Sequence, residues 1–186
     1  KGFVCNDDQN LKNIIRKTKN KNFYTYGKDK KSNFQIVNIK QTSNFSSFDI
    51  KINIPSKKKI IKRIKLPMIG IHNIRNATAA IALAFTIGLP EKCIKAGLYN
   101  FKGVQRRFSH LFDHNKISFY DDYAHHPTEI SSVLSGVEKV YENKEIVCVF
   151  QPHRISRVKS LKKEFSKCFK KADTVLLCPI YTANEK

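Results

Sequence analysis

Residues that can do acid–base or anion-binding chemistry gather in two short segments of the sequence. Residues 121–129 read Asp-Asp-Tyr-Ala-His-His-Pro-Thr-Glu, and residues 151–157 read Gln-Pro-His-Arg-Ile-Ser-Arg. Together they hold three of the six histidines and two of the seven arginines. This combination favours an anionic ligand that carries a phosphate or a carboxylate, because arginine makes paired hydrogen bonds to either group.

Hydrophobic periodicity predicts the elements that carry these segments. Short apolar runs at 117–120, 146–150 and 174–178 are typical of buried strands. Residues 127–141 and 157–171 between them have the period of amphipathic helices. The alternation predicts a parallel sheet covered on both faces, which right-handed crossovers make part of a Rossmann-like α/β domain.

In such a sheet, ligands bind beyond the carboxyl ends of the strands. The two segments, with residues 179–185 after the last strand, should therefore meet at one edge. Taken singly, each residue has an ordinary explanation: Asp121 and Asp122 could cap a turn, and His125 and His126 could lie on the surface ahead of a helix. Gathered at one edge, they favour a binding site.

The first half of the chain has a different pattern. Residues 1–26 indicate a helix and then a short strand, and 27–33 form a polar loop. Alternating apolar residues at 48–54 and 60–66, separated by a Pro-Ser turn, predict an antiparallel hairpin. The many lysines of the second strand fit a solvated edge better than a nucleic-acid patch.

A buried helix over residues 77–85 follows, with Asn73 as its predicted N-cap and Gly88 near its end. A second helix should run from Pro90 to about Tyr99. The segment after it contains Gly103 and is the best candidate for a domain boundary. The predicted domains are therefore 1–102 and 103–186.

Composition narrows the class of protein. The formal charge is +20 on 186 residues, but 28 of the 35 basic residues are lysines spread along the chain, as in proteins from AT-rich genomes. A hydrophobic content of 41% makes wholesale disorder unexpected. No apolar run is long enough to predict a membrane span. The five cysteines form no C-x-x-C pair and are interpreted as reduced, buried thiols of a cytoplasmic protein.

Two kinds of cofactor site lack their usual sequence signals. No H-E-x-x-H or C-x-x-C spacing supports a transition-metal site, and neighbouring histidines such as His125 and His126 diverge in most backbones. Neither G-x-x-x-x-G-K-[ST] nor G-x-G-x-x-G is present. If the protein uses a triphosphate, the main phosphate cradle lies outside this sequence.

Four motifs resemble those of the Mur ligases. Residues 70–77 (Gly-Ile-His-Asn-Ile-Arg-Asn-Ala) are similar to the family's G-x-H-N-x-x-N-A motif, and 103–108 (Gly-Val-Gln-Arg-Arg-Phe) to its link into the C-terminal domain. Residues 121–129 and 151–157 narrow the match to the branch that adds the first amino acid of peptidoglycan. The resemblance implies the end of the central ATPase domain (1–102), with helices and a hairpin, followed by part of the C-terminal domain (103–186). The chain is thus expected to be a fragment, inactive alone.

The implied activity is ATP-dependent ligation of L-alanine to the carboxylate of UDP-N-acetylmuramate through an acyl phosphate, in a bacterial cytoplasm. Magnesium would accompany ATP, with its ligands mostly upstream and none here. Neither nucleic acid nor membrane insertion is expected, and the oligomeric state is left open. The resemblance implies roles for residues that match the family's motifs. For ATP these are His72, Asn73, Asn76, Arg107 and Asp122; for the substrates, Tyr123, His125, His126, Arg154 and Arg157; and for catalysis, Arg107, Asp122 and His125.

Two alternatives stay open at this point. A sibling ligase that recycles murein tripeptide also carries a D-D-x-x-H-H-P motif, although its sequence differs at the Gln-Pro-His-Arg segment. From another class, a basic nucleic-acid-binding module would explain the charge but leave the Asp-Asp-Tyr and His-His motif without a role.

Overall fold

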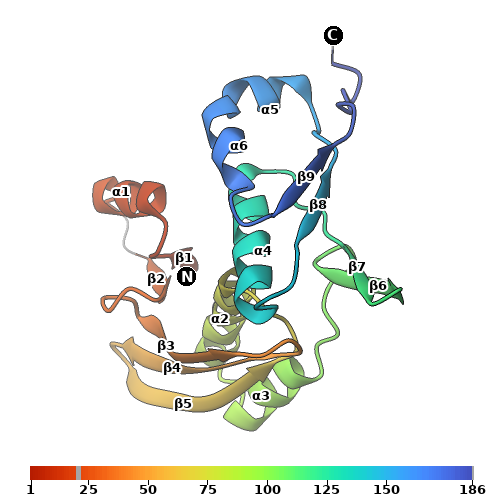
Figure 1. Ribbon diagram of the computed structural model, residues 1–186. Helices are drawn as coiled ribbons and strands as arrows, with labels where there is room; N and C mark the ends of the chain where they lie inside the picture. Colours follow the sequence, from red (N-terminus) through yellow and green to blue (C-terminus); the bar gives the residue numbers. More distant parts are fainter. Residues whose placement is uncertain (20–21, 186) are drawn as a thin grey trace. The chain divides into compact units, whose positions relative to one another are not determined.

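The computed structural model describes residues 1–19 and 22–185 (Figure 1). The chain divides into two compact units, Lys1–Lys102 and Gly103–Lys186. Each unit has a hydrophobic core of its own. In the described residues, no helix is long and apolar enough to span a membrane.

The first unit is built on a mixed five-stranded sheet in the order β1-β2-β3-β4-β5 (Figure 1). The first three strands run parallel, and β4 and β5 are antiparallel to their neighbours. The strands are β1 (Gly2–Cys5), β2 (Phe23–Gly27), β3 (Phe34–Gln41), β4 (Ser46–Ile54) and β5 (Lys57–Leu66), and helix α1 (Gln9–Lys17) connects β1 to β2.

The predicted hairpin is confirmed as β4 and β5, joined by a tight turn at Pro55 and Ser56. Along β4 every second residue is buried, so one face of the strand meets the core and the other faces solvent. On β5 the lysines lie mostly on the exposed side, while Ile61, Ile64 and Leu66 are buried.

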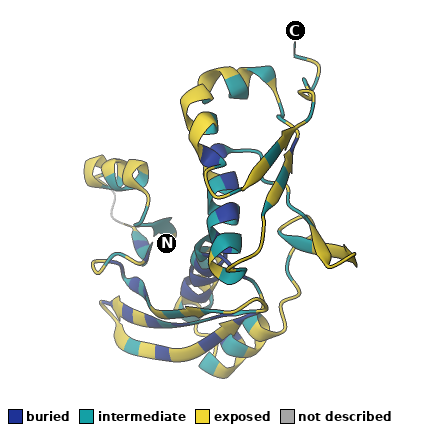
Figure 2. Ribbon diagram, in the orientation of Figure 1, coloured by how far each residue is buried: buried dark blue, intermediate teal, exposed yellow. Residues whose placement is uncertain are grey.

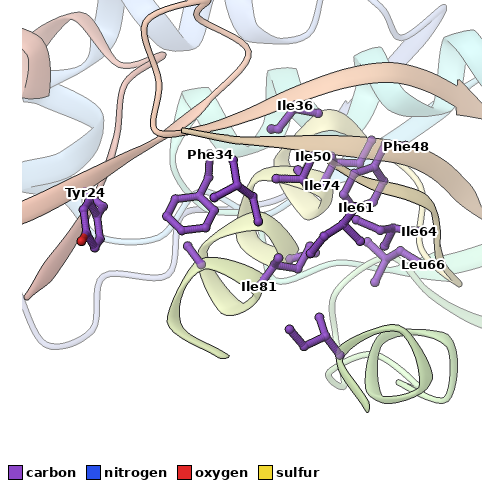
Figure 3. Close-up of a cluster of buried hydrophobic side chains, with 14 of the residues drawn as sticks. Tyr24, Phe34, Ile36, Phe48, Ile50, Ile61, Ile64, Leu66, Ile74 and Ile81 are labelled. Carbon is purple, nitrogen blue, oxygen red and sulfur yellow. The ribbon is translucent and has the colours of Figure 1, made fainter. Parts of the chain in front are cut away.

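Helix α2 (Ile71–Thr86) covers the buried face of this sheet, and α3 (Glu91–Tyr99) packs against α2 and β5. Figure 3 shows the side chains of Ile74 and Ile81 on α2 among those of Phe34, Phe48 and Ile61. All five are at most 1% exposed. This core holds α2 against the sheet and so fixes the place where the helix begins.

The helices confirm two predictions and correct one. The helix ends before Gly88, whose φ of +89° suits glycine, and α3 agrees with the second predicted helix. Asn73, however, is not the N-cap, because α2 begins at Ile71 with Gly70 at the cap. Asn73 lies in the first turn and donates a hydrogen bond from Nδ2 to the Ile69 carbonyl oxygen at 2.7 Å.

The second unit contains two small sheets and three helices. Strands β6 and β7 form an antiparallel hairpin, and β8 and β9 pair in parallel. The bounds are β6 (Ser109–His114), β7 (Ile117–Asp121), α4 (Pro127–Val140), β8 (Val147–Phe150), α5 (Ile155–Ser160), α6 (Lys162–Cys168) and β9 (Thr174–Leu177).

The prediction of one parallel sheet through all three apolar strands is wrong for the first of them. β7 pairs with β6, a strand that was not predicted, through a two-residue turn in which Asn115 and Lys116 both have positive φ. This geometry matches the turns that join twisted antiparallel strands. A cavity of about 540 Å³ is lined by residues of β7, α4 and β8.

Two further expectations change in detail. The predicted helix over 157–171 is two short helices, α5 and α6, because Leu161 between them leaves helical geometry at φ −116° and ψ 26°. The cysteines are free thiols, but only Cys168 is buried and Cys93 is exposed on α3. The small core of this unit lies between α4, α6 and β8, around Ile130, Leu134 and Phe150.

Candidate functional site

Three segments of the second unit meet through a row of aromatic and histidine rings. The His125 ring, after β7, lies 6.3 Å from that of His153, after β8. His153 lies 5.2 Å from the Tyr181 ring, after β9, and the two residues form a parallel bridge. Tyr123 extends the row at 5.0 Å from His125. The predicted meeting of the segments is therefore observed, although β7 is not in the sheet with β8 and β9.

A strained turn presents Arg107 beside this row. Arg106 and Phe108, on either side of it, have φ of +58° and +49°, which costs non-glycine residues free energy. Asp122 holds the turn, because its carboxylate accepts hydrogen bonds from the Phe108 amide at 2.8 Å and the Ala124 amide at 2.7 Å. The Tyr123 amide donates to the Arg106 carbonyl at 2.7 Å. Asp122 thus fixes the backbone from which Arg107 extends into solvent.

Glu129 organises the start of α4 and both adjacent histidines. Its Oε2 accepts from the His125 amide at 3.1 Å and the His126 amide at 3.2 Å, which together with the His126 side chain makes a capping box. Partial burial opposes ionisation, yet these amides and the positive charges nearby hold the pKa of Glu129 below its ordinary value. Arg107 Nη1 lies 3.7 Å from Glu129 Oε1, a loose ion pair that leaves the guanidinium available.

The rings of His125 and His126 are held by different hydrogen bonds. Nδ1 of His125 lies 2.9 Å from the carbonyl oxygen of Tyr123, which can only accept. Nδ1 therefore carries the proton, and in the neutral ring Nε2 is an acceptor. In contrast, Nδ1 of His126 accepts a hydrogen bond from the Thr128 amide and serves as the cap of α4.

The second predicted segment presents its arginines from another strained backbone. Arg154 has a φ of +69° directly before α5. Its amide donates to the Tyr181 carbonyl at 2.8 Å, and the side chain is exposed. Arg157, one turn later, donates from Nη1 to the His153 carbonyl at 3.4 Å. Both guanidinium groups thus lie on the segment that follows β8.

The remaining predicted residues, His72, Asn73 and Asn76, lie in the first turns of α2 in the first unit. Gly70 has a φ of +91°, and a β-carbon there would come within 2.5 Å of the His72 ring. Glycine is therefore required for the ring to lie over the helix start. Asn73 is buried and tied to the Ile69 carbonyl, whereas Asn76 is exposed. The three residues thus share one end of one helix.

A nearly buried carboxylate, that of Asp7, joins this helix to the ends of the parallel strands. Its Oδ2 accepts from Arg75 Nε at 2.7 Å, and its Oδ1 from the amides of Lys28 and Asp29 at 2.8 and 3.1 Å. Burial opposes ionisation, but these donors hold the pKa of Asp7 below its ordinary value. Arg75 lies between Asn73 and Asn76, so the ion pair fixes the turn that carries them.

A metal centre would need several ligands in one place. Within residues 1–19 and 22–185, no three His, Cys, Asp or Glu side chains come together in a way that could hold an ion.

The family models divide the chain in two. The Mur ligase middle domain matches residues 1–84, and the Mur ligase glutamate ligase domain matches residues 106–186. The chain belongs to the Mur ligase family. The two strained turns and the start of α2 described above therefore lie in segments of a Mur ligase.

Individual relatives sharpen this assignment. The UDP-N-acetylmuramate–L-alanine ligase of Pelagibacter ubique is 63% identical over all of this chain, which covers 40% of that relative. The structure of the UDP-N-acetylmuramate–alanine ligase of Thermotoga maritima has a TM-score of 0.70 and 33% identity over 85% of this chain and 34% of its own. A murein peptide ligase from Psychrobacter arcticus has a TM-score of 0.56 and 27% identity, over 83% of this chain and 32% of its own. The chain therefore spans less than half the length of each.

Sequence reasoning missed several residues that shape these sites. Glu129 had a usable signal, since a cap residue followed by Glu three positions later is typical of a capping box, but His replaces the usual Ser or Thr. Asp7 had no local signal, and Tyr181 and Glu185 were expected near the site only as members of the segment 179–185. Their partners lie 21 to 68 residues away along the chain, as in the Asp7–Lys28, Asp7–Arg75 and Ser156–Glu185 pairs.

Proposed function

We propose that this chain is part of an ATP-dependent ligase that joins L-alanine to the carboxylate of UDP-N-acetylmuramate in peptidoglycan synthesis, and that it is inactive without the rest of that enzyme. Residues 1–102 would be the end of its central ATP-binding domain, and 103–186 the first part of its ligase domain. The observation that carries the proposal is the 63% identity, over the whole chain, to a relative of that name. The lower identity to a murein peptide ligase favours L-alanine over a peptide as the incoming group.

The reaction needs an activated carboxylate. ATP would transfer its γ-phosphoryl group to the muramoyl carboxylate, and the amine of L-alanine would attack the acyl phosphate and expel inorganic phosphate. Most of the help required is positioning and neutralisation of negative charge. The strained turn around Arg107 suits this task, because Asp122 holds the backbone while the exposed guanidinium stays free to meet phosphate oxygens.

The amine must lose a proton when it attacks. We propose His125 as the base, since its Nδ1 is held by the Tyr123 carbonyl and its Nε2 is left as an acceptor. Arg154 and Arg157 would bind the carboxylate of L-alanine, with Tyr123 beside its methyl group. His126 stays a proposed substrate ligand through Nε2 only, because Nδ1 caps α4.

On the nucleotide side, Asn73 and Asn76 would approach the adenine and His72 would order the helix start. Arg107 would meet the phosphates and Asp122 the ribose. Magnesium is proposed to accompany ATP, although the described residues do not gather three ligands for it. A nucleotide-linked substrate and free thiols support a cytoplasmic location.

A chimera tests the proposal. This chain would replace its matching region in the Pelagibacter ubique relative, which supplies the remaining length. We expect phosphate release that requires UDP-N-acetylmuramate, ATP and L-alanine together, with the alanylated product identified by mass spectrometry. Release driven by murein tripeptide and not by L-alanine would support the recycling alternative, and no release with either would contradict the ligase proposal.

Two substitutions in the chimera test the residue roles. Arg107→Ala should lower kcat/KM about 100-fold or more, because an unneutralised transition-state charge costs several kcal/mol. His125→Gln should lower kcat with little change in the KM for ATP. Unchanged kinetics in either variant would contradict the role given to that residue.

A further inference from the structure

The segment after β9 holds the strained Arg154 backbone through a set of hydrogen bonds. The Tyr181 amide donates to the Pro152 carbonyl, and the Arg154 amide donates to the Tyr181 carbonyl, both at 2.8 Å. Gln151 Nε2 also donates to the Pro179 carbonyl at 3.3 Å. A non-glycine residue persists at positive φ only where its surroundings determine the conformation. The backbone of 179–185 supplies part of that constraint.

Glu185 constrains the same segment on the other side of Arg154. Its Oε2 accepts from the Ser156 amide at 2.9 Å, and its Oε1 accepts from the Ser156 hydroxyl at 2.7 Å. These bonds, with the positive charge of Arg154 nearby, hold the pKa of Glu185 below its ordinary value. Both carboxylate oxygens are thus committed to one residue, two positions after Arg154 and one before Arg157.

We propose that Glu185 is a positioning residue for amino-acid recognition, acting through Ser156 to set the direction of Arg154 and Arg157. The proposal rests on the proposed function for the role of the two arginines. Glu185 does not touch the ligand in this scheme. With Tyr181 it fixes the segment on both sides of Arg154, so that the two guanidinium groups start from a rigid backbone and lose less freedom when they bind a carboxylate.

The kinetic test uses the chimera. Glu185→Ala should raise the KM for L-alanine about tenfold or more, in line with the loss of charge-assisted hydrogen bonds, and leave the KM for ATP within about twofold. Glu185→Gln keeps one acceptor oxygen, so its KM for L-alanine should fall between those of Glu185→Ala and the unchanged enzyme. The matched control is Glu138→Ala, which removes an exposed glutamate of the same unit that pairs with Lys171 at 2.7 Å. It should match the unchanged enzyme.

Two kinetic outcomes would overturn the proposal. One is a KM for L-alanine that stays within about twofold in Glu185→Ala. The other is an equal rise in all three substrate KM values, since that would indicate general loss of structure and no selective effect on the arginines.

A second measurement separates this proposal from the proposed function. Trypsin cleaves after Arg154 and Arg157, and cleavage reports how often a segment opens. In Glu185→Ala, cleavage at these two sites should be faster by about tenfold, and in Glu138→Ala it should not change. If the chimera does not use L-alanine, the proposed function fails while this assay still judges the positioning contact. Unchanged cleavage would overturn the contact itself.

Discussion

The two units position their candidate residues by different physical means. In the first unit buried residues gather on the sheet and on α2 (Figure 2). Phe34, Phe48 and Ile50 in this large core are fully buried (Figure 3), and the core sets the start of α2. In the second, only a small cluster is buried, while Val149 and Leu177 on the β8–β9 pair are 66% and 68% exposed. There the arginines depend on carboxylates that hold strained loops. Substitutions in the first unit should therefore mainly lower the free energy of unfolding. Substitutions of the carboxylates in the second should mainly change the direction of the arginine side chains.

The largest effect should come from the core of the first unit. Phe48→Ala removes a fully buried ring from β4 and should cost about 3–5 kcal/mol of unfolding free energy. Phe150→Ala in the second unit should cost less, because its smaller cluster can relax around the gap. Amide hydrogen exchange resolved by unit would measure both, with Phe48→Leu in case the alanine variant does not fold. Equal losses of unfolding free energy in Phe48→Ala and Phe150→Ala would contradict the difference between the two cores.

The Asp7 ion pair should give the next effect. Asp7→Asn leaves Arg75 and two amides with weaker partners and should cost about 1–3 kcal/mol. Because the folded pKa of Asp7 lies below its ordinary value, its stabilisation is present above that ordinary value and is lost as the pH falls through the folded pKa. Exchange measured from pH 7 to pH 3 should therefore show the variant and the parent converging in acid.

The matched control for Asp7 is an exposed carboxylate of the same unit. Glu91 pairs with Lys59 and Lys95, both at 2.7 Å, at the surface. Glu91→Gln should cost no more than about 1 kcal/mol. A loss as large as that of Asp7→Asn would contradict the view that burial gives the Asp7 pair its weight.

The smallest effect should come from a tyrosine pair in the second unit. Burial and the hydroxyl of Tyr120, at 2.9 Å, raise the pKa of Tyr141 to about 12. Its contribution is therefore present below the ordinary tyrosine pKa and is lost as the pH rises toward about 12. Tyr120→Phe should cost about 1 kcal/mol and move the ultraviolet titration of Tyr141 toward neutral pH. An unchanged titration would show that burial alone sets that pKa.

Hydrophobic periodicity predicted the helices and strands that bury one face along their whole length. The alternation of Phe48, Ile50 and Ile52 made β4 readable because one face meets a core along its whole length. β6 could not be read in this way, since its residues from His110 to His114 are exposed and carry no pattern of burial. Its turn also lacks glycine, so the strongest hairpin signal was absent.

The sequence predicted which segments meet at the candidate site, because these segments follow strands that were expected to run in the same direction. Residues after successive apolar strands were expected together, and the rings of His125, His153 and Tyr181 do lie together. The hydrogen bonds of Asp122, Glu129 and Glu185 could not be foreseen, because they depend on backbone conformations that only the folded chain defines. The individual roles of the site residues stay predictions.

The carboxylate of Asp7 also limits how relatives of this chain can vary in sequence. A β-carbon at Gly27 would lie 2.5 Å from Asp7 Oδ1, and the φ of +144° at Gly27 independently favours glycine. The dependence is one-sided. Position 27 can stay glycine after position 7 changes, but a larger residue at 27 should appear among homologues only where the aspartate at 7 has already been lost.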